Sequence, residues 1–420
     1  MISNLYTPSP CAAGHPPHSL PPAPQRSGPP QPREPARHPT HPVDRYCVRV
    51  EDCREIDQAM AHSKMLRPDY LVARPRPEWL QARNAFIELQ RRLYRDASDF
   101  LRTPSASAAI APARMQTLPQ LPPDATPETI IAAALRERDG IVIGESHDAL
   151  GSKRFVIDHL GALRANGVRA LFIEHLLSDL HQDDLDQAHA ARGQRISPRL
   201  LTYLNTLDQG FGTDPAGDYG FRALVLRALQ GGMRVIAIDC AASYYDASMR
   251  TLAHEHGGRD GALDTKQTVR LKMMNFFALQ VIQQWRHAEG GKWVALCGTS
   301  HLKTNFTVPD GQPATPPGLA DLTGGLALRT VDTPAAAGGP TIVPDPGEID
   351  EGSLHWGRGT YRYAGDFLLT MPLPESRSAP AVAATPAAPA APAAPADSAL
   401  AGAQDMRVAA ARHRGRCVIS

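Results

Sequence analysis

The chain has 420 residues, a length typical of two or three domains, but it carries 39 prolines and 33 glycines, and the prolines crowd its two ends. We therefore expect the folded part to be shorter than the chain. A formal net charge of +1 excludes a strongly basic nucleic-acid-binding protein. No apolar run reaches about 18 residues, so we expect no transmembrane helix. The N-terminus lacks the charged and apolar regions of an ordinary secretory signal, which leaves another export route open.

The cysteines indicate the redox state of the compartment in which the protein is found, and the basic residues indicate the kind of organism that encodes it. Six cysteines without a Cys-x-x-Cys pair favour reduced thiols in a cytosolic compartment. Lysine is rare among the 44 cationic residues, and arginine, alanine, glycine and proline are abundant. This bias is typical of a GC-rich genome, so we expect a bacterial source and synthesis in the bacterial cytoplasm.

Both ends of the chain are expected to be disordered arms. Residues 1–44 are rich in proline and form a candidate export signal, and residues 374–420 contain Ala-Ala-Pro repeats. Neither segment can bury enough apolar surface to offset its chain entropy. Between them, residues 45–125 read as an accessory segment, with an amphipathic helix over 78–94 followed by a Ser/Ala/Pro-rich linker.

Residues 126–373 are predicted to form an α/β domain. Short runs of Val, Ile and Leu predict strands at 140–144, 170–173, 234–238, 293–296 and 326–329, with an edge strand at 366–370. Helical patterns separate them, at 127–138, 151–166, 178–191, 197–208, 219–231 and 265–288. This alternation predicts a largely parallel sheet covered by helices on both faces, with disordered N- and C-terminal arms.

Titratable residues collect where the predicted strands end. Glu145 and His147 follow the first strand, Glu174 and His175 the second, Asp239 the third and His301 the fourth. The carboxyl ends of parallel strands open into one crevice, where ligands bind in open α/β sheets. Residues that are far apart in the sequence are therefore expected to meet there.

Three interpretations of this cluster remain open. Glu145, His147, Glu174 and His301 are candidate catalytic residues for acid–base chemistry, in which a histidine moves a proton and a carboxylate stabilises its charged form. The same four residues are candidate ligands of a divalent metal that activates water. Alternatively, the glutamates cap helices and the histidines are hydrogen-bonded partners in a polar core.

Other candidates carry weaker signals. Ser146 is not expected to be an esterase nucleophile, because Asp148 stands where a G-x-S-x-G turn needs glycine. Cys240 and Cys297 end apolar strands, as buried core thiols do. Lys153 is expected either to meet an anionic substrate or, more simply, to lie at a solvated helix end.

The segments around these residues resemble a known superfamily. They read Ile-Gly-Glu-Ser-His at 143–147, Leu-Phe-Ile-Glu-His-Leu-Leu-Ser-Asp-Leu-His at 171–181 and Trp-Val-Ala-Leu-Cys-Gly-Thr-Ser-His at 293–301. The pattern is similar to the erythromycin esterase/ChaN/Tiki-like superfamily, in the form found in bacterial membrane-targeted effector toxins, over residues 130–330. The resemblance implies that Glu145, His147, Glu174 and His301 occupy active-site positions. It leaves the reaction open, since the superfamily contains hydrolases, metal-dependent proteases and haem binders.

The last four residues, Cys417-Val-Ile-Ser, fit the C-a-a-X pattern with a terminal serine, which is typical of farnesylation. A basic cluster precedes them on the Ala/Pro-rich stalk. We therefore expect lipidation of Cys417 by a host prenyltransferase and attachment to a host membrane surface. The alternative is an accidental cysteine on a frayed tail.

Together these patterns predict a bacterial effector or toxin that is delivered into eukaryotic host cells and carries a hydrolase-like Glu/His crevice. They do not identify its host substrate or any cofactor, a divalent metal being the one candidate, and no nucleic-acid partner is expected. Two alternatives remain. One is a non-catalytic toxin module that binds a host protein or lipid through the crevice, and the other is a haem or metal carrier.

Overall fold

A computed structural model describes the central part of the chain. The described residues are 43–47, 77–104, 118–122, 124–245, 249–256, 265–308, 311, 315–334, 338–351 and 360–373. The predicted arms at 1–44 and 374–420, including Cys417, lie outside these residues except for Val43 and Asp44. Of the predicted linker, only a few residues are described.

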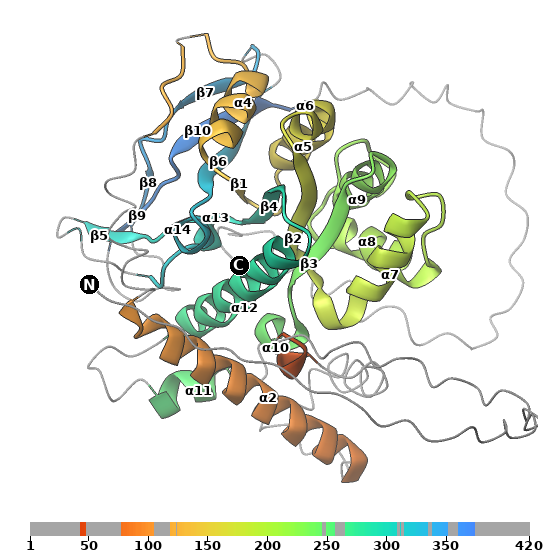
Figure 1. Ribbon diagram of the computed structural model, residues 1–420. Coiled ribbons are helices and arrows are strands. Elements are labelled where there is room, and N and C mark those ends of the chain that lie inside the picture. Colours follow the sequence, from red (N-terminus) through yellow and green to blue (C-terminus); the bar gives the residue numbers. More distant parts are fainter. Residues whose placement is uncertain are drawn as a thin grey trace, which may run out of the picture. The chain divides into compact units, whose positions relative to one another are not determined.

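A seven-stranded sheet forms the centre of the fold (Figure 1), in the order β3-β2-β4-β1-β6-β10-β7. Its strands are β1 (Gly140–Glu145), β2 (Val168–Leu177), β3 (Arg234–Asp239), β4 (Lys292–Gly298), β6 (Leu326–Thr333), β7 (Thr341–Pro344) and β10 (Phe367–Pro372). All neighbouring pairs are parallel except β10 and β7. The predicted fold class, a largely parallel α/β sheet, is confirmed. The edge position predicted for 366–370 is wrong, because β7 pairs outside β10 and places it within the sheet.

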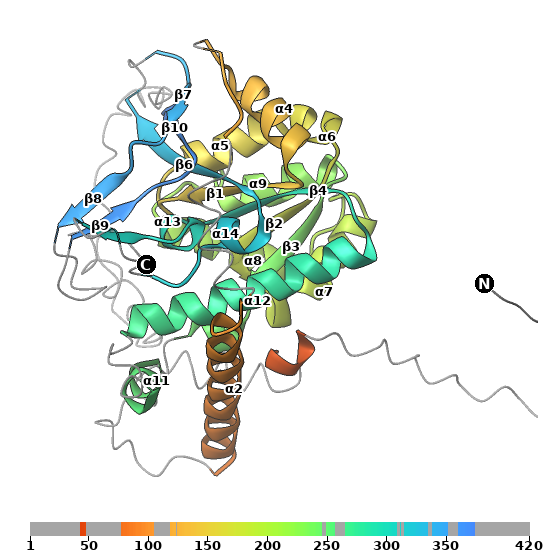
Figure 2. The same ribbon diagram turned by 60° about the vertical axis from the view of Figure 1, so that its left-hand side comes forward.

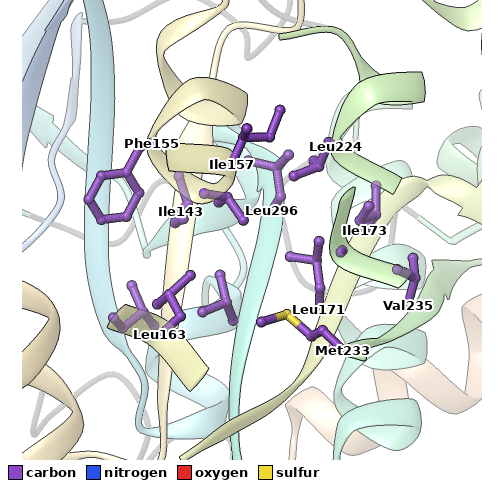
Figure 3. Close-up of a cluster of buried hydrophobic side chains, with 14 of the residues drawn as sticks. Ile143, Phe155, Ile157, Leu163, Leu171, Ile173, Leu224, Met233, Val235 and Leu296 are labelled. Atoms are coloured by element: carbon purple, nitrogen blue, oxygen red, sulfur yellow. The ribbon is translucent and has the colours of Figure 1, made fainter. Parts of the chain in front are cut away.

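The central strands of the sheet are largely apolar because both of its faces are buried there. Side chains alternate along β1, where Ile141 and Ile143 enter one hydrophobic core and Val142 enters the other. Figure 3 shows part of the first core, in which Ile143, Leu171 and Leu296 from adjacent strands lie against helical side chains. The strands β1, β2, β3, β4 and β6 therefore each supply side chains to both cores, whereas β10 contributes to the first core.

Six helices supply residues to the first core. They are α4 (Pro127–Glu137), α5 (Gly151–Asp158), α6 (Leu160–Ala165), α7 (Ser178–Ala190), α8 (Pro198–Gly210) and α9 (Phe221–Gln230). Two of them begin with a proline behind a hydroxyl cap, since Thr126 accepts from the Thr129 N–H and Ser197 from the Leu200 N–H. The single helix predicted over 151–166 is wrong. It is broken at His159, whose backbone leaves the helical region.

The second core lies under α12 (Lys266–Ala288), which crosses the opposite face of the sheet with α2 (Pro77–Leu101) packed against it (Figure 2). Five shorter helices among the described residues add to this face: η1 (Asp44–Tyr46), α10 (Ala241–Tyr244), α11 (Met249–His256), α13 (Thr299–Leu302) and α14 (Leu319–Thr323). The accessory helix predicted over 78–94 is thus longer than expected. Gln90 holds it to the domain by donating to the carbonyls of Ala242 (2.9 Å) and Tyr245 (2.6 Å).

A small antiparallel sheet, not predicted from the sequence, lies beyond the main one. It contains β5 (Phe306–Val308), β9 (Thr360–Tyr363) and β8 (Glu348–Glu351). A short helix, α13 (Thr299–Leu302), joins the end of β4 to this region. Within the described part of the chain, no helix combines the length and the apolar character needed to cross a membrane.

Candidate active site

Glu145, at the end of β1, is buried in a network of fixed polar contacts. Its Oε2 accepts hydrogen bonds from the Lys153 ammonium (2.9 Å) and from the Ser152 hydroxyl. Lys153 also donates to the carbonyls of His147 (3.1 Å) and Ala149 (2.7 Å), so it fixes the loop after the strand. The other carboxylate oxygen, Oε1, has no hydrogen-bond partner among the described residues and lies 3.5 Å from His147 Nδ1.

His147 is paired with a histidine that the sequence analysis did not single out. The Nε2 atom of His175 lies 2.8 Å from Nδ1 of His147, and the two rings meet edge to face. Phe211 and Phe221 surround His175, and the Tyr203 hydroxyl donates to its carbonyl (2.5 Å). Burial, with His147 adding to it, lowers the pKa of His175 well below its usual value, so this imidazole is neutral.

Glu174 precedes His175 and faces the other core. Its Oε2 accepts from the backbone N–H of Gly298 (2.7 Å), and its Oε1 lies 3.0 Å from Nη2 of Arg270 and 3.3 Å from Nε2 of His301. Burial alone would raise the pKa of Glu174. Interaction with His301, His175 and Arg270 outweighs burial and holds this pKa well below its usual range.

Arg270, on α12, joins Glu174 to Asp239 at the end of β3. The same Nη2 atom donates to Asp239 Oδ2 at 2.6 Å, and the Ser243 hydroxyl donates to the other oxygen of Asp239. Burial raises the pKa of Asp239 to about 6, although Arg270 opposes this shift. The guanidinium therefore lies between two buried carboxylates.

His301, in α13, is held on its second nitrogen. Nδ1 lies 2.7 Å from the Asn275 side-chain oxygen, and the Asn275 amide donates to the Pro317 carbonyl at 2.9 Å. Burial lowers the pKa of His301 to about 4, against the opposing effect of Glu174. The imidazole is therefore neutral near pH 7.

The cluster has two halves, one around Glu145 and His147 and the other around Glu174 and His301. They meet over Gly298, where β4 ends. A Cβ atom at this position would lie 2.9 Å from Cε1 of His147 and 3.6 Å from Oε2 of Glu174, so only glycine fits between these side chains. The structure thus brings together all four predicted site residues, Glu145, His147, Glu174 and His301, and each is at least nine-tenths buried. His147, at 8% exposure, is the most accessible of them, next to the exposed residues Ser146 and Asp148.

The structure also decides the roles of three weaker candidates. Lys153 is fully buried against Glu145, so the expectation of a solvated helix end is wrong. Cys240 and Cys297 are buried, and burial raises the pKa of both thiols well above the usual value, as expected for core cysteines.

Three side chains could together hold a metal ion. Among the described residues, Glu145, His147 and His175 offer ligand atoms that all lie within 4.8 Å of one another. Glu174 and His301, expected as ligands, do not belong to this group. The Lys153 ammonium already balances Glu145, and Nδ1 of His175 lacks the hydrogen-bond partner that metal-bound imidazoles almost always have. The donor set therefore fits a resident divalent cation poorly.

A comparison with known proteins shows a partial similarity in sequence to a bacterial toxin. No protein-family model matches the chain. A segment of 176 residues is 30% identical to part of the Multifunctional-autoprocessing repeats-in-toxin of Vibrio vulnificus. The match spans 42% of this chain and only 3% of that toxin.

Two solved structures overlap partially with the fold. The RRSP effector domain of a MARTX toxin from Vibrio vulnificus CMCP6 matches with a TM-score of 0.42 and 20% identity, over 68% of this chain and 55% of that one. ChaN of Campylobacter jejuni, described with cofacial haem, matches with a TM-score of 0.32 and 13% identity, over 58% and 90% of the two chains. The resemblance to erythromycin esterases stays an expectation. The chain is thus similar in sequence, over less than half of its length, to a small part of a bacterial toxin.

Proposed function

We propose that this protein is a bacterial toxin effector that acts inside eukaryotic host cells as a hydrolase. Its sequence similarity to part of a Vibrio toxin supports the toxin assignment. The observation that carries the hydrolytic assignment is the convergence of two carboxylate–imidazole pairs, Glu145 with His147 and Glu174 with His301, at Gly298. Acid–base hydrolysis uses positioned side chains of this kind to take a proton from water and to return it to the leaving group.

In the proposed mechanism one histidine takes a proton from water while the other donates a proton to the leaving group or holds a developing oxyanion. Glu145 and Glu174 stabilise the imidazolium form of the neighbouring ring. Lys153 and Arg270 each place a positive charge against one of these two buried carboxylates. No step requires a metal ion.

Expression in eukaryotic cells tests this proposal. We expect induction of the full chain to arrest growth, and the double variant His147→Gln/His301→Gln to abolish the arrest, because both of the histidines proposed to transfer protons are removed. The matched control is His287→Gln, at an exposed position of α12, which should remain toxic. Circular dichroism and immunoblotting establish that each variant is folded and equally abundant.

Persisting toxicity of a folded double variant would contradict hydrolysis by this cluster and would favour the non-catalytic binding module. The carrier alternative is addressed by elemental analysis and absorption spectroscopy of the purified chain. A stoichiometric metal ion or a haem absorption band would favour it over the hydrolase.

We further propose that Cys417, outside the described residues, is farnesylated in the host and that the tail tethers the protein to a membrane. A single lipid chain binds a bilayer only weakly, with an association constant on the order of 10⁴ M⁻¹ for a myristoyl group, so a second membrane-binding signal is needed. The basic residues before the cysteine supply this second signal. Each cation near an anionic leaflet adds about 1 kcal/mol of favourable binding free energy. These basic residues are Arg407, Arg412, Arg414 and Arg416.

Fractionation of host cells checks the tether. We expect the unaltered chain in the membrane fraction and Cys417→Ser in the soluble fraction, with Cys11→Ser, near the other end, as the matched control. A farnesyltransferase inhibitor should move the unaltered chain to the soluble fraction. Equal partitioning of the unaltered chain and Cys417→Ser, or no response to the inhibitor, would show that the motif is unused.

A further inference from the structure

We infer that Asn275 is a positioning residue that fixes the tautomer of His301, holding the proton on Nδ1 and making Nε2 the atom that accepts a proton. The role of Nε2 in catalysis rests on the hydrolysis proposed above. The tautomer itself rests only on the contacts of His301 and Asn275.

The contacts of Asn275 leave one orientation for its amide. A proline carbonyl can only accept a hydrogen bond, so the atom of Asn275 that lies 2.9 Å from the Pro317 oxygen must be the NH₂ group. A flipped amide would place two oxygens against each other. The Asn275 oxygen therefore faces His301 and, being only an acceptor, requires a donor there.

This requirement determines the protonation of His301. The atom 2.7 Å from the Asn275 oxygen is Nδ1, so Nδ1 must carry a proton. Both residues are almost completely buried, at 1% and 2% exposure, so water is not readily available as a substitute partner. The neutral form with its proton on Nε2 would leave the Nδ1 lone pair against the Asn275 oxygen at 2.7 Å, whereas the Nδ1–H form leaves the Nε2 lone pair against Glu174 Oε1 at the longer distance of 3.3 Å. The shorter contact therefore decides the tautomer.

With Nδ1–H fixed, protons enter and leave His301 only at Nε2. This atom lies 3.3 Å from Glu174 Oε1, and the second Glu174 oxygen is already held by the Gly298 N–H. A proton taken from an attacking water moves to the Nε2 lone pair, the hydroxide bonds to the substrate, and Glu174 stabilises the resulting imidazolium. The proton then passes to the leaving group, which restores the neutral ring.

The low pKa of His301 agrees with this assignment. Burial lowers it to about 4, so the ring is neutral at pH 7 and its Nε2 lone pair is available. The same reasoning does not decide the tautomer of His147. Its Nδ1 faces Nε2 of His175, an atom that either donates or accepts.

Long-range ¹H–¹⁵N correlation spectra of the full chain, labelled with ¹⁵N-histidine, test the inference at pH 7. The resonances that disappear in His301→Gln identify His301. We expect its Nδ1 at the chemical shift of a protonated nitrogen and its Nε2 at that of an unprotonated one. Nε2 protonated with Nδ1 bare would overturn the inference.

Variants of Asn275 separate positioning from a purely structural role. Asn275→Asp keeps an acceptor for Nδ1–H and should retain the Nδ1–H spectrum, whereas Asn275→Leu removes it and should give a mixture of tautomers. The matched control Asn205→Leu, in α8, should leave His301 unchanged. An unaltered His301 spectrum in folded Asn275→Leu would contradict the role of Asn275.

The spectra also keep this inference distinct from the proposed function. If His301→Gln remains toxic while the unaltered chain shows the Nδ1–H tautomer, the hydrolase proposal fails and the tautomer assignment stands. If the variant loses toxicity while the spectrum shows Nε2–H, the positioning role of Asn275 fails and the hydrolase proposal stands.

Discussion

Replacing Arg270 by methionine is expected to lower the free energy of unfolding by about 3–5 kcal/mol at neutral pH. The guanidinium contacts Glu174 at 3.0 Å and Asp239 at 2.6 Å, and both carboxylates are almost fully buried. Without it, two negative charges would face each other in a medium of low dielectric. Urea unfolding followed by circular dichroism measures the loss.

The loss of stability caused by Arg270→Met is expected to depend on pH and to be larger at neutral than at acidic pH. Burial raises the pKa of Asp239 to about 6 even with Arg270 opposing the shift, so without the guanidinium this pKa should be higher. The uncompensated carboxylates of the variant therefore take up protons and lose their charge as pH falls from 7. In the unaltered protein the ionised Glu174, whose pKa is lowered, contributes stability at neutral pH. This contribution is lost as pH falls, so the unaltered protein becomes less stable while the variant is relieved of its unpaired charges. The difference between variant and unaltered protein should therefore shrink from pH 7 to pH 4.

Two variants make the expectation specific to the buried charges. The triple variant Arg270→Met/Glu174→Gln/Asp239→Asn removes all three charges and should recover much of the lost stability. Arg234→Met breaks ion pairs with Asp186 and Glu289 in which the arginine side chain is 29% exposed, and should cost about 1 kcal/mol. A cost for Arg270→Met no greater than that for Arg234→Met would contradict the account of the network.

Lys153→Met is expected to destabilise the protein by a similar amount, about 3–5 kcal/mol, through the other half of the site. Methionine matches the length of the lysine side chain but leaves Glu145 with only the Ser152 hydroxyl. The carbonyls of His147 and Ala149 would lose a donor as well. Thermal and urea unfolding at pH 7 measure the change.

Adding Glu145→Gln to Lys153→Met should restore part of the stability, because it removes the unpaired buried charge. Lys292→Met serves as the matched control. Its ammonium donates to the Leu135 carbonyl at a half-buried position, and its loss should cost about 1 kcal/mol. If the two single variants are equally stable, the ion pair of Lys153 does not support the site in the way described.

The sequence predicted the main strands well because their signal is local. Continuous runs of Val, Ile and Leu, such as residues 140–144, mark strands that are buried on both faces. The strand β7 has no such run, since its residues Thr341–Pro344 are largely exposed. The residues of β7 therefore gave no sign that this segment pairs with β10, and β10 was wrongly predicted to be the edge strand.

The site was predictable to the extent that strand ends reveal it. Glu145, His147, Glu174 and His301 follow directly from the rule that ligands gather at the carboxyl edge of a parallel sheet. His175 was missed because side chains alternate along a strand, so the neighbour of Glu174 is expected to face the opposite layer. It does so, and it meets His147 there.

The residues that hold the second half of the site had no local signal. Arg270 and Asn275 lie within α12, about a hundred residues after Glu174 in the sequence, where they read as ordinary polar positions of a long helix. Only the packing of α12 across the sheet brings them to Glu174 and His301. Single-sequence patterns cannot supply a contact of that range.

The strand order gives this protein a high contact order at its functional centre. In the sheet β1 pairs with β4 and β6, although β2, β3 and α12 all intervene in the chain. Glu145 becomes the register partner of Gly298 only after this long loop has closed, and such non-local pairing forms late and slowly. A chain that is still being synthesised, or is threaded unfolded through a transport channel, therefore contains the residues of the site without the site itself.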